Sequence, residues 1–111
     1  DSMGLCLFVS HTPEDVYGAY VASTGSKLTP EALNTIGERI YNLERMFNMK
    51  AGLTGADDTL PPRLTSEPVP EGPAKGQVVE LDKMLPEYYK VRGWDDQGVP
   101  TPEKLQQLGI A

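Results

Sequence analysis

The chain has 111 residues, a formal net charge of -6 and a sequence pI near 4.6. This acidic balance argues against a nucleic-acid-binding protein, because neutralising phosphates requires clustered Lys and Arg. No run approaches the roughly 20 apolar residues of a membrane-spanning helix, so we expect no membrane partner and a cytoplasmic protein. The single cysteine, Cys6, excludes an internal disulfide. Together with the single histidine, His11, it provides too few ligands for a zinc site, which takes about four.

Residues 12–52 are expected to form a helical hairpin. Thr12 can cap the first helix, and Gly25 can end it. The second helix should run from about Pro30 to about Met49, since Pro suits the first helical position.

The second helix carries an apolar stripe. Its residues recur at i, i+3, i+7, i+10 and i+14, which places them on one helical face: Leu33, Ile36, Ile40, Leu43 and Phe47. We expect these side chains to be among the most buried in the chain. The other side carries Glu38, Arg39, Asn42, Glu44 and Arg45. That side is either a solvent-exposed face with side-chain pairing or a face that docks onto another part of a larger protein.

Residues 53–77 are rich in proline and glycine. Prolines at this density argue against a helix and against central strands, and a structureless loop of this length is uncommon inside a compact domain. We therefore expect an extended segment that is strapped across a larger surface. The adjacent carboxylates Asp57 and Asp58 are interpreted as solvated.

Residues 78–111 are expected to hold the terminal helices. The first should end at Gly93, and a last short helix, capped by Thr101, should end at Gly109. The aromatic residues of this region should belong to the core with their polar groups hydrogen-bonded: Tyr88, Tyr89 and Trp94. No segment alternates with period two, so the expected fold class is mainly α with no substantial sheet.

Generic catalytic motifs such as GxGxxG, the P-loop, GxSxG and HExxH are absent. The first six residues, Asp1-Ser2-Met3-Gly4-Leu5-Cys6, resemble the D-x-x-G-L-C element of the tungsten-containing aldehyde:ferredoxin oxidoreductase family. Further segments resemble the C-terminal region of that family in the same order: residues 37–48, 57–63, 72–76, 81–85, 88–95, 98–105 and 108–109. The resemblance therefore covers nearly the whole chain.

The resemblance implies that residues 1–10 are a cofactor-motif segment. In it, Asp1 and Leu5 would bind a tungsten (or molybdenum) bis-pterin, and Cys6 would ligate a neighbouring [4Fe-4S] cluster. The side chains suit these roles, because a carboxylate accepts paired hydrogen bonds and a thiolate is the usual ligand of iron–sulfur clusters. The resemblance also implies that aldehydes are oxidised to carboxylic acids, with electrons passing through the cluster to ferredoxin.

The chain departs from the family pattern in what it lacks. The family's three-cysteine cluster element, its other D-x-x-G-L motif, its N-terminal pterin-binding domain and its proposed acid/base Glu and His have no counterpart here. His11 follows the motif and takes no catalytic role, and no catalytic residue is assigned.

We therefore expect residues 1–111 to be a C-terminal helical domain fragment, inactive and without cofactor when isolated. Its expected partners are the remainder of the parent enzyme, ferredoxin and an aldehyde substrate. The alternative is a stand-alone helical interaction module without redox activity.

Overall fold

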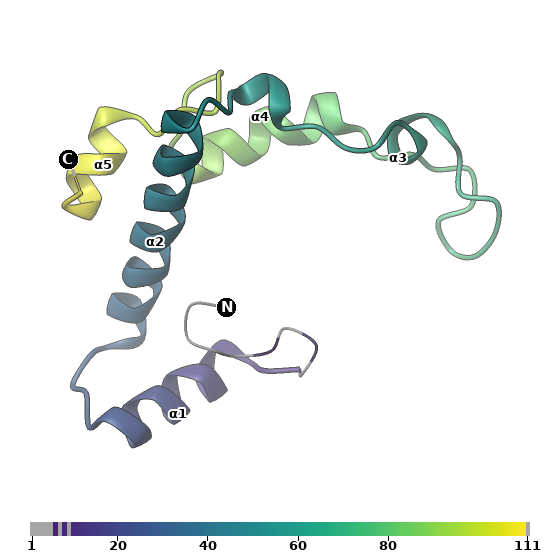
Figure 1. Cartoon of the computed structure of the whole chain (residues 1–111). Coiled ribbons are helices and arrows are strands. Elements are labelled where there is room, and N and C mark those ends of the chain that lie inside the picture. The colour runs from purple at the N-terminus through teal and green to yellow at the C-terminus, as the bar shows by residue number, and fades with distance from the viewer. Residues whose placement is uncertain (1–5, 7, 9, 111) are drawn as a thin grey trace. The chain divides into compact units, whose positions relative to one another are not determined.

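The computed structural model describes residues 6, 8 and 10–110. In chain order its elements are α1 (Pro13–Thr24), α2 (Pro30–Lys50), the 3₁₀ helix η1 (Gly55–Asp57), α3 (Pro62–Ser66), α4 (Leu81–Arg92) and α5 (Pro102–Leu108) (Figure 1). The prediction of a mainly α fold without a substantial sheet is confirmed, since no strand occurs among the described residues. The chain divides into two compact units, Asp1–Arg39 and Ile40–Ala111, with the boundary inside α2.

In the first unit, α1 begins and ends where the sequence predicts. The hydroxyl of Thr12 accepts a hydrogen bond from the backbone N–H of Asp15 at 3.1 Å, and the Asp15 carboxylate accepts one from the Thr12 N–H at 3.0 Å. This reciprocal pair is a capping box. At the other end, Gly25 has a φ of 66° and closes the helix. The Tyr17 hydroxyl then donates to the carbonyl of Leu28 at 3.0 Å, which holds α1 against the loop before α2.

Helix α2 also matches its predicted bounds and ends at Lys50. Its first turn is capped by Thr29, whose hydroxyl accepts a hydrogen bond from the Ala32 N–H at 3.2 Å.

The prediction of which face of α2 is buried is wrong. Leu43 and Phe47 of the apolar stripe are 48% and 71% exposed, and the other three residues of the stripe are half-buried: Leu33, Ile36 and Ile40. The buried residues of α2 are instead Asn42 and Arg45. The side chains of Asn42 and Arg45 are buried because they form hydrogen bonds with Trp94 and Gly98, which follow α4.

The proline-rich residues 53–77 contain two short helical turns, η1 and α3, that the sequence did not predict. Helix α3 begins at Pro62, and a proline at the first position loses no intrahelical hydrogen bond. After α3, the chain folds back through hydrogen bonds from the Val69 N–H to the Gln77 carbonyl at 3.0 Å and from the Val79 N–H to the Leu64 carbonyl at 2.9 Å.

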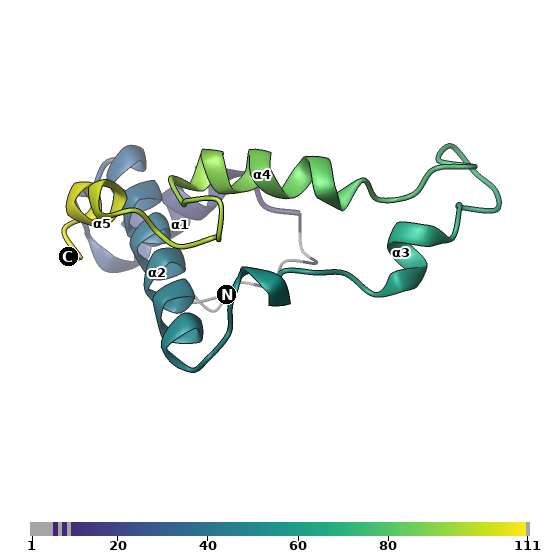
Figure 2. The same cartoon turned by 90° about the horizontal axis from the view of Figure 1, so that it is seen from above.

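The terminal helices confirm their predicted ends. Helix α4 ends at Gly93, and α5 is capped by Thr101 and ends at Gly109. In Figures 1 and 2, α4 and α5 lie beside the part of α2 that belongs to the second unit. The buried hydrophobic residues among those described are Tyr89, Trp94 and Leu108. In the described part of the chain, no helix combines the length and the apolar character needed to cross a membrane.

Candidate functional site

Cys6 is the one predicted site residue that the structure describes. Its thiol is free and exposed, and it lies outside the helices. This position does not support a role for Cys6 as a packed apolar residue, and it leaves the sulfur accessible as a ligand. The other two predicted cofactor-binding residues, Asp1 and Leu5, lie outside the described residues.

The donor set around this thiol is small. Across residues 6, 8 and 10–110, no three His, Cys, Asp or Glu side chains are grouped so that they could hold a metal ion, and His11 is exposed. Iron–sulfur clusters are held by about four ligands, usually cysteines. The described residues could therefore give such a cluster one thiolate, and its other ligands would have to come from elsewhere.

A second polar cluster lies in the second unit around Arg45. Its guanidinium donates from Nη1 and Nη2 to the two carboxylate oxygens of Asp58 at 2.7 and 2.5 Å, and from Nε to the carbonyl of Gly98 at 2.8 Å. The side chains of Arg45 and Asp58 are only 10% and 23% exposed. The interpretation of Asp58 as solvated is therefore wrong, because its position after η1 turns the carboxylate toward α2.

Tyr89 completes this cluster, since its hydroxyl donates a hydrogen bond to the carboxylate of Asp58. The guanidinium of Arg45, with a further contribution from the Tyr89 hydroxyl, holds the pKa of the Asp58 carboxyl below its usual value. Burial, followed by the hydrogen bond to Asp58, raises the pKa of Tyr89 to about 12. An acid–base catalyst works best with a pKa near the operating pH. Both shifts move the pKa further from neutral pH, downward for Asp58 and upward for Tyr89. The Arg45 cluster is therefore suited to a structural role rather than to proton transfer.

Trp94 links the Arg45 cluster to the rest of α2. Its indole N–H donates to the Asn42 amide oxygen at 2.8 Å, and the guanidinium of Arg45 lies 4.8 Å from its ring centroid. Asn42 has no exposed surface. The prediction that Trp94 and Tyr89 are core residues with hydrogen-bonded polar groups is confirmed.

Tyr41 and Tyr88 lie beside the Trp94 ring. Tyr88, which the sequence predicts to be a core residue, is only half-buried, and Tyr41 is exposed. Their hydroxyl oxygens are 2.6 Å apart, and the guanidinium of Arg92 lies 4.1 Å from the Tyr41 ring centroid. An open pocket of about 280 Å³ lies beside them. The arginine and carboxylate that help to line it, Arg45 and Asp58, are already paired with each other. This arrangement favours a structural contact over a ligand site.

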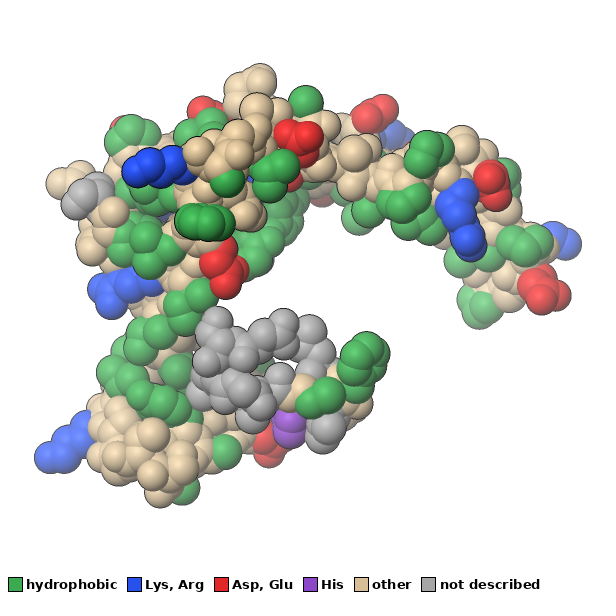
Figure 3. Space-filling model, viewed as in Figure 1, with side chains coloured by type: hydrophobic (Ala, Val, Ile, Leu, Met, Phe, Trp, Pro, Cys, Tyr) green, Lys and Arg blue, Asp and Glu red, His purple; other side chains and the backbone are tan. Residues whose placement is uncertain are grey.

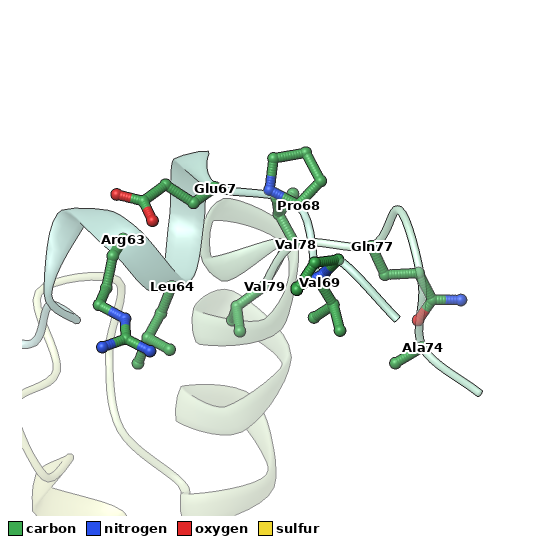
Figure 4. A pocket seen from close by; sticks show the side chains of 10 residues that line it. Arg63, Leu64, Glu67, Pro68, Val69, Ala74, Gln77, Val78 and Val79 are labelled. Carbon is green, nitrogen blue, oxygen red and sulfur yellow. The ribbon is translucent and has the colours of Figure 1, made fainter. Parts of the chain in front are cut away.

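A larger open pocket of about 400 Å³ lies between α3 and the loop that follows it. Figure 4 shows the side chains of Leu64, Val69 and Val79 pointing to the same side of this segment. Leu64 and Val69 are 41% and 39% exposed. The pocket is apolar over most of its lining, with Arg63 and Glu67 at its rim. Its character is that of a packing surface.

The Arg45 cluster was missed at the level of sequence because its members are far apart. Arg45 is 13 residues from Asp58 and 53 residues from Gly98. The one indication of the cluster in the sequence was the set of polar residues opposite the apolar stripe of α2. From the sequence alone, that set could be either a solvent-exposed face or a docking face.

Comparison with known proteins adds an independent line of evidence. The model of the family "Aldehyde ferredoxin oxidoreductase, domains 2 & 3" matches residues 1–110. The tungsten-containing aldehyde ferredoxin oxidoreductase of Pyrococcus furiosus is 53% identical over 114 residues, which cover 100% of this chain and 19% of that protein. The protein of the same name from Thermococcus kodakarensis is 50% identical with the same coverage.

A more distant relative carries a different name. The aliphatic sulfonate oxidoreductase, WOR-like subunit, of Pyrococcus furiosus is 36% identical over 120 residues, which cover 99% of this chain and 19% of that protein. The chain thus spans about 19% of the length of the curated relatives that it matches.

Proposed function

The chain belongs to the aldehyde ferredoxin oxidoreductase family, and we propose that the protein containing it oxidises aldehydes to carboxylic acids. The observation that carries this proposal is the family match over residues 1–110. We propose aldehydes rather than sulfonates as the substrate class, because the relatives named for aldehydes are 47% to 53% identical to this chain, whereas the relative named for sulfonates is 36% identical.

The proposed reaction converts an aldehyde and one water into a carboxylic acid, two protons and two electrons. When bound, a tungsten (or molybdenum) bis-pterin and a [4Fe-4S] cluster would supply the redox chemistry, with ferredoxin as the electron acceptor. The protein would supply orientation and tuning. The names of the closely similar relatives support tungsten. The pterin, the cluster and ferredoxin are parts of the proposal that rest on the family resemblance.

In this scheme Cys6 supplies one cluster thiolate, and Asp1 and Leu5 contact the pterin. The exposed, free thiol of Cys6 supports its part. The other cluster ligands and the main pterin-binding domain come from the remainder of the parent enzyme, so residues 1–111 alone are inactive. The cytoplasmic location expected from the sequence stays a prediction.

The test is Cys6→Ala in the full-length enzyme. Removing one thiolate should open the cluster to loss or to conversion into a three-iron form. Electron paramagnetic resonance of the reduced protein should therefore lose the [4Fe-4S] signal. Aldehyde-dependent reduction of ferredoxin should fall by at least about tenfold, the lower end of the loss caused by removing even an outer-shell partner of a metal site.

Ser10→Ala is the matched control, because Ser10 is exposed and lies outside the D-x-x-G-L-C element. It should leave the signal and the activity unchanged. An unchanged [4Fe-4S] signal with full activity in Cys6→Ala would contradict the role of Cys6 and weaken the roles proposed for Asp1 and Leu5. If Cys6 were an ordinary packed residue, its truncation would instead cost on the order of 1–2 kcal/mol of stability and leave the redox centre intact.

A further inference from the structure

Within the second unit, α2 turns its polar side inward and its apolar side outward. Asn42 and Arg45 are 0% and 9% exposed, whereas Leu43 and Phe47 are 48% and 71% exposed. A helix on the surface of a complete globular protein shows the opposite arrangement, with its apolar stripe toward the core. We call the side carrying Leu43 and Phe47, one turn apart, the outer face of α2.

The outward position of these apolar side chains is fixed by contacts on the opposite side of the helix. Arg45 makes hydrogen bonds to Asp58 and to the carbonyl of Gly98, and Asn42 accepts the indole hydrogen bond of Trp94. Turning α2 so that Phe47 faced inward would leave these buried polar groups without partners, which is costly. The outer face of α2 therefore stays outward as long as this unit is folded.

Other apolar side chains of the second unit are exposed as well, among them Leu53, Leu64 and Met84. In Figure 3, hydrophobic side chains gather on the visible side of α2 and around α3. Contiguous apolar patches on soluble proteins mark sites of interaction with another surface.

The occupant follows from the size of the relatives. This chain covers 19% of the length of each of the relatives compared above, and the matching family model describes domains 2 and 3 of a larger protein. We propose that the outer face of α2 docks, through Leu43 and Phe47, against an apolar surface of the parent polypeptide outside residues 1–111.

This inference rests on the family membership that also underlies the proposed function, but on none of the redox roles given to Asp1, Leu5 and Cys6. The experiment replaces Phe47 with p-benzoylphenylalanine in the full-length protein, followed by irradiation and peptide mass spectrometry. The expected result is a crosslink within one polypeptide to a peptide outside residues 1–111. Its yield should be several-fold higher than that from the same reporter at Asp96, an exposed residue of the polar turn after α4.

A second reporter at Leu43, on the same face, guards against a folding defect at position 47 and should reach the same region of the parent. Crosslinks that join two polypeptides, crosslinks confined to residues 1–111, or yields no higher than at Asp96 would each overturn the inference. The Cys6→Ala experiment reads out the cluster and not this contact. Loss of the proposed redox role would therefore leave the crosslink unchanged, and the two failures are distinguishable.

Discussion

Asp58 accepts hydrogen bonds from two side chains that are distant in sequence, Arg45, 13 residues before it, and Tyr89, 31 residues after it. The carboxylate thus joins α2 to α4 through the loop that contains η1. Because Arg45 is buried and permanently charged, the pair matters chiefly through the cost of leaving that guanidinium without its partner. Desolvation of the ion pair offsets much of its own attraction.

Asp58→Asn in the full-length protein tests this contact. The substitution keeps the size of the side chain but leaves Arg45 without a counter-charge. We expect a local destabilisation of about 2 kcal/mol, below the usual range for a fully buried pair because Asp58 is partly exposed. Hydrogen exchange of the amides in residues 89–100 should accelerate by roughly 30-fold. Asp96→Asn, in an exposed turn, is the control and should leave exchange unchanged.

The same variant carries a pH signature. The folded-state pKa of Asp58 is lowered by Arg45 and then by Tyr89. Its contribution to stability is therefore fully present above the unfolded-state pKa of about 3.9 and is lost as the pH falls through the lower, folded-state value. The difference in exchange between wild type and Asp58→Asn should be constant near neutrality and should shrink below about pH 4. A difference that persists unchanged in acid would contradict an ionic origin.

At the scale of elements, local chemistry was enough to predict both ends of α1 and α5 and the end of α4. Thr12 and Thr101 cap their helices through side-chain hydrogen bonds, and Gly25, Gly93 and Gly109 end helices with positive φ angles. These signals involve residues within about one turn of each other, so both partners are recognisable in a short stretch of sequence.

The rotation of α2 about its axis could not be predicted in the same way. An apolar stripe indicates that one helical face packs against another apolar surface. It does not indicate whether that surface belongs to the same 111 residues. The contacts that decide the question, from Arg45 to Gly98 and from Asn42 to Trp94, span 53 and 52 residues. Helix α3 was not predicted for a different reason: a high density of prolines disfavours helices in general, but Pro62 stands at the first helical position, where proline is tolerated.

Gly98→Ala in the full-length protein tests how closely α2 and the loop after α4 approach each other. Gly98 has a φ of 73°, and a Cβ atom there would collide with the guanidinium of Arg45 and lie 2.8 Å from Cζ of Tyr89. The expected cost is the roughly 1–2 kcal/mol of a left-handed alanine plus the loss of the Arg45 cluster. Thermal unfolding and hydrogen exchange of residues 89–100 should both register it.

Gly72→Ala is the matched control for that prediction. Gly72 has a similar φ of 85°, but nothing lies within 4 Å of the position of its added Cβ. It should therefore show only the backbone cost of about 1–2 kcal/mol. Equal effects of Gly72→Ala and Gly98→Ala would mean that the close approach to Arg45 contributes nothing to stability.

At the scale of the whole molecule, the described residues bury little apolar surface. Their buried hydrophobic side chains are those of Tyr89, Trp94 and Leu108, while other large apolar side chains such as Phe8 and Phe47 are exposed. Folding is driven mainly by apolar burial, at roughly 25 cal/mol per Å². This distribution is typical of a part of a larger protein, in which the missing burial is supplied by the rest of the polypeptide.

Metal content of isolated residues 1–111 is the corresponding whole-molecule prediction. With one cysteine in the sequence, a single chain offers one thiolate where a [4Fe-4S] cluster takes about four. After anaerobic incubation with iron and sulfide, followed by desalting, elemental analysis should therefore find no stoichiometric iron. The Cys6→Ala version of the same chain should give the same background value.

The stoichiometry of any iron that is bound also tells the explanations apart. About four iron atoms per monomeric chain would contradict the prediction, because the cluster would then be held without the cysteines that the remainder of the enzyme is proposed to supply. About one iron atom per chain in a tetramer, lost in Cys6→Ala, would mean instead that four copies of Cys6 share one cluster. Light scattering measured on the same sample separates these cases, because only the shared cluster requires the larger particle.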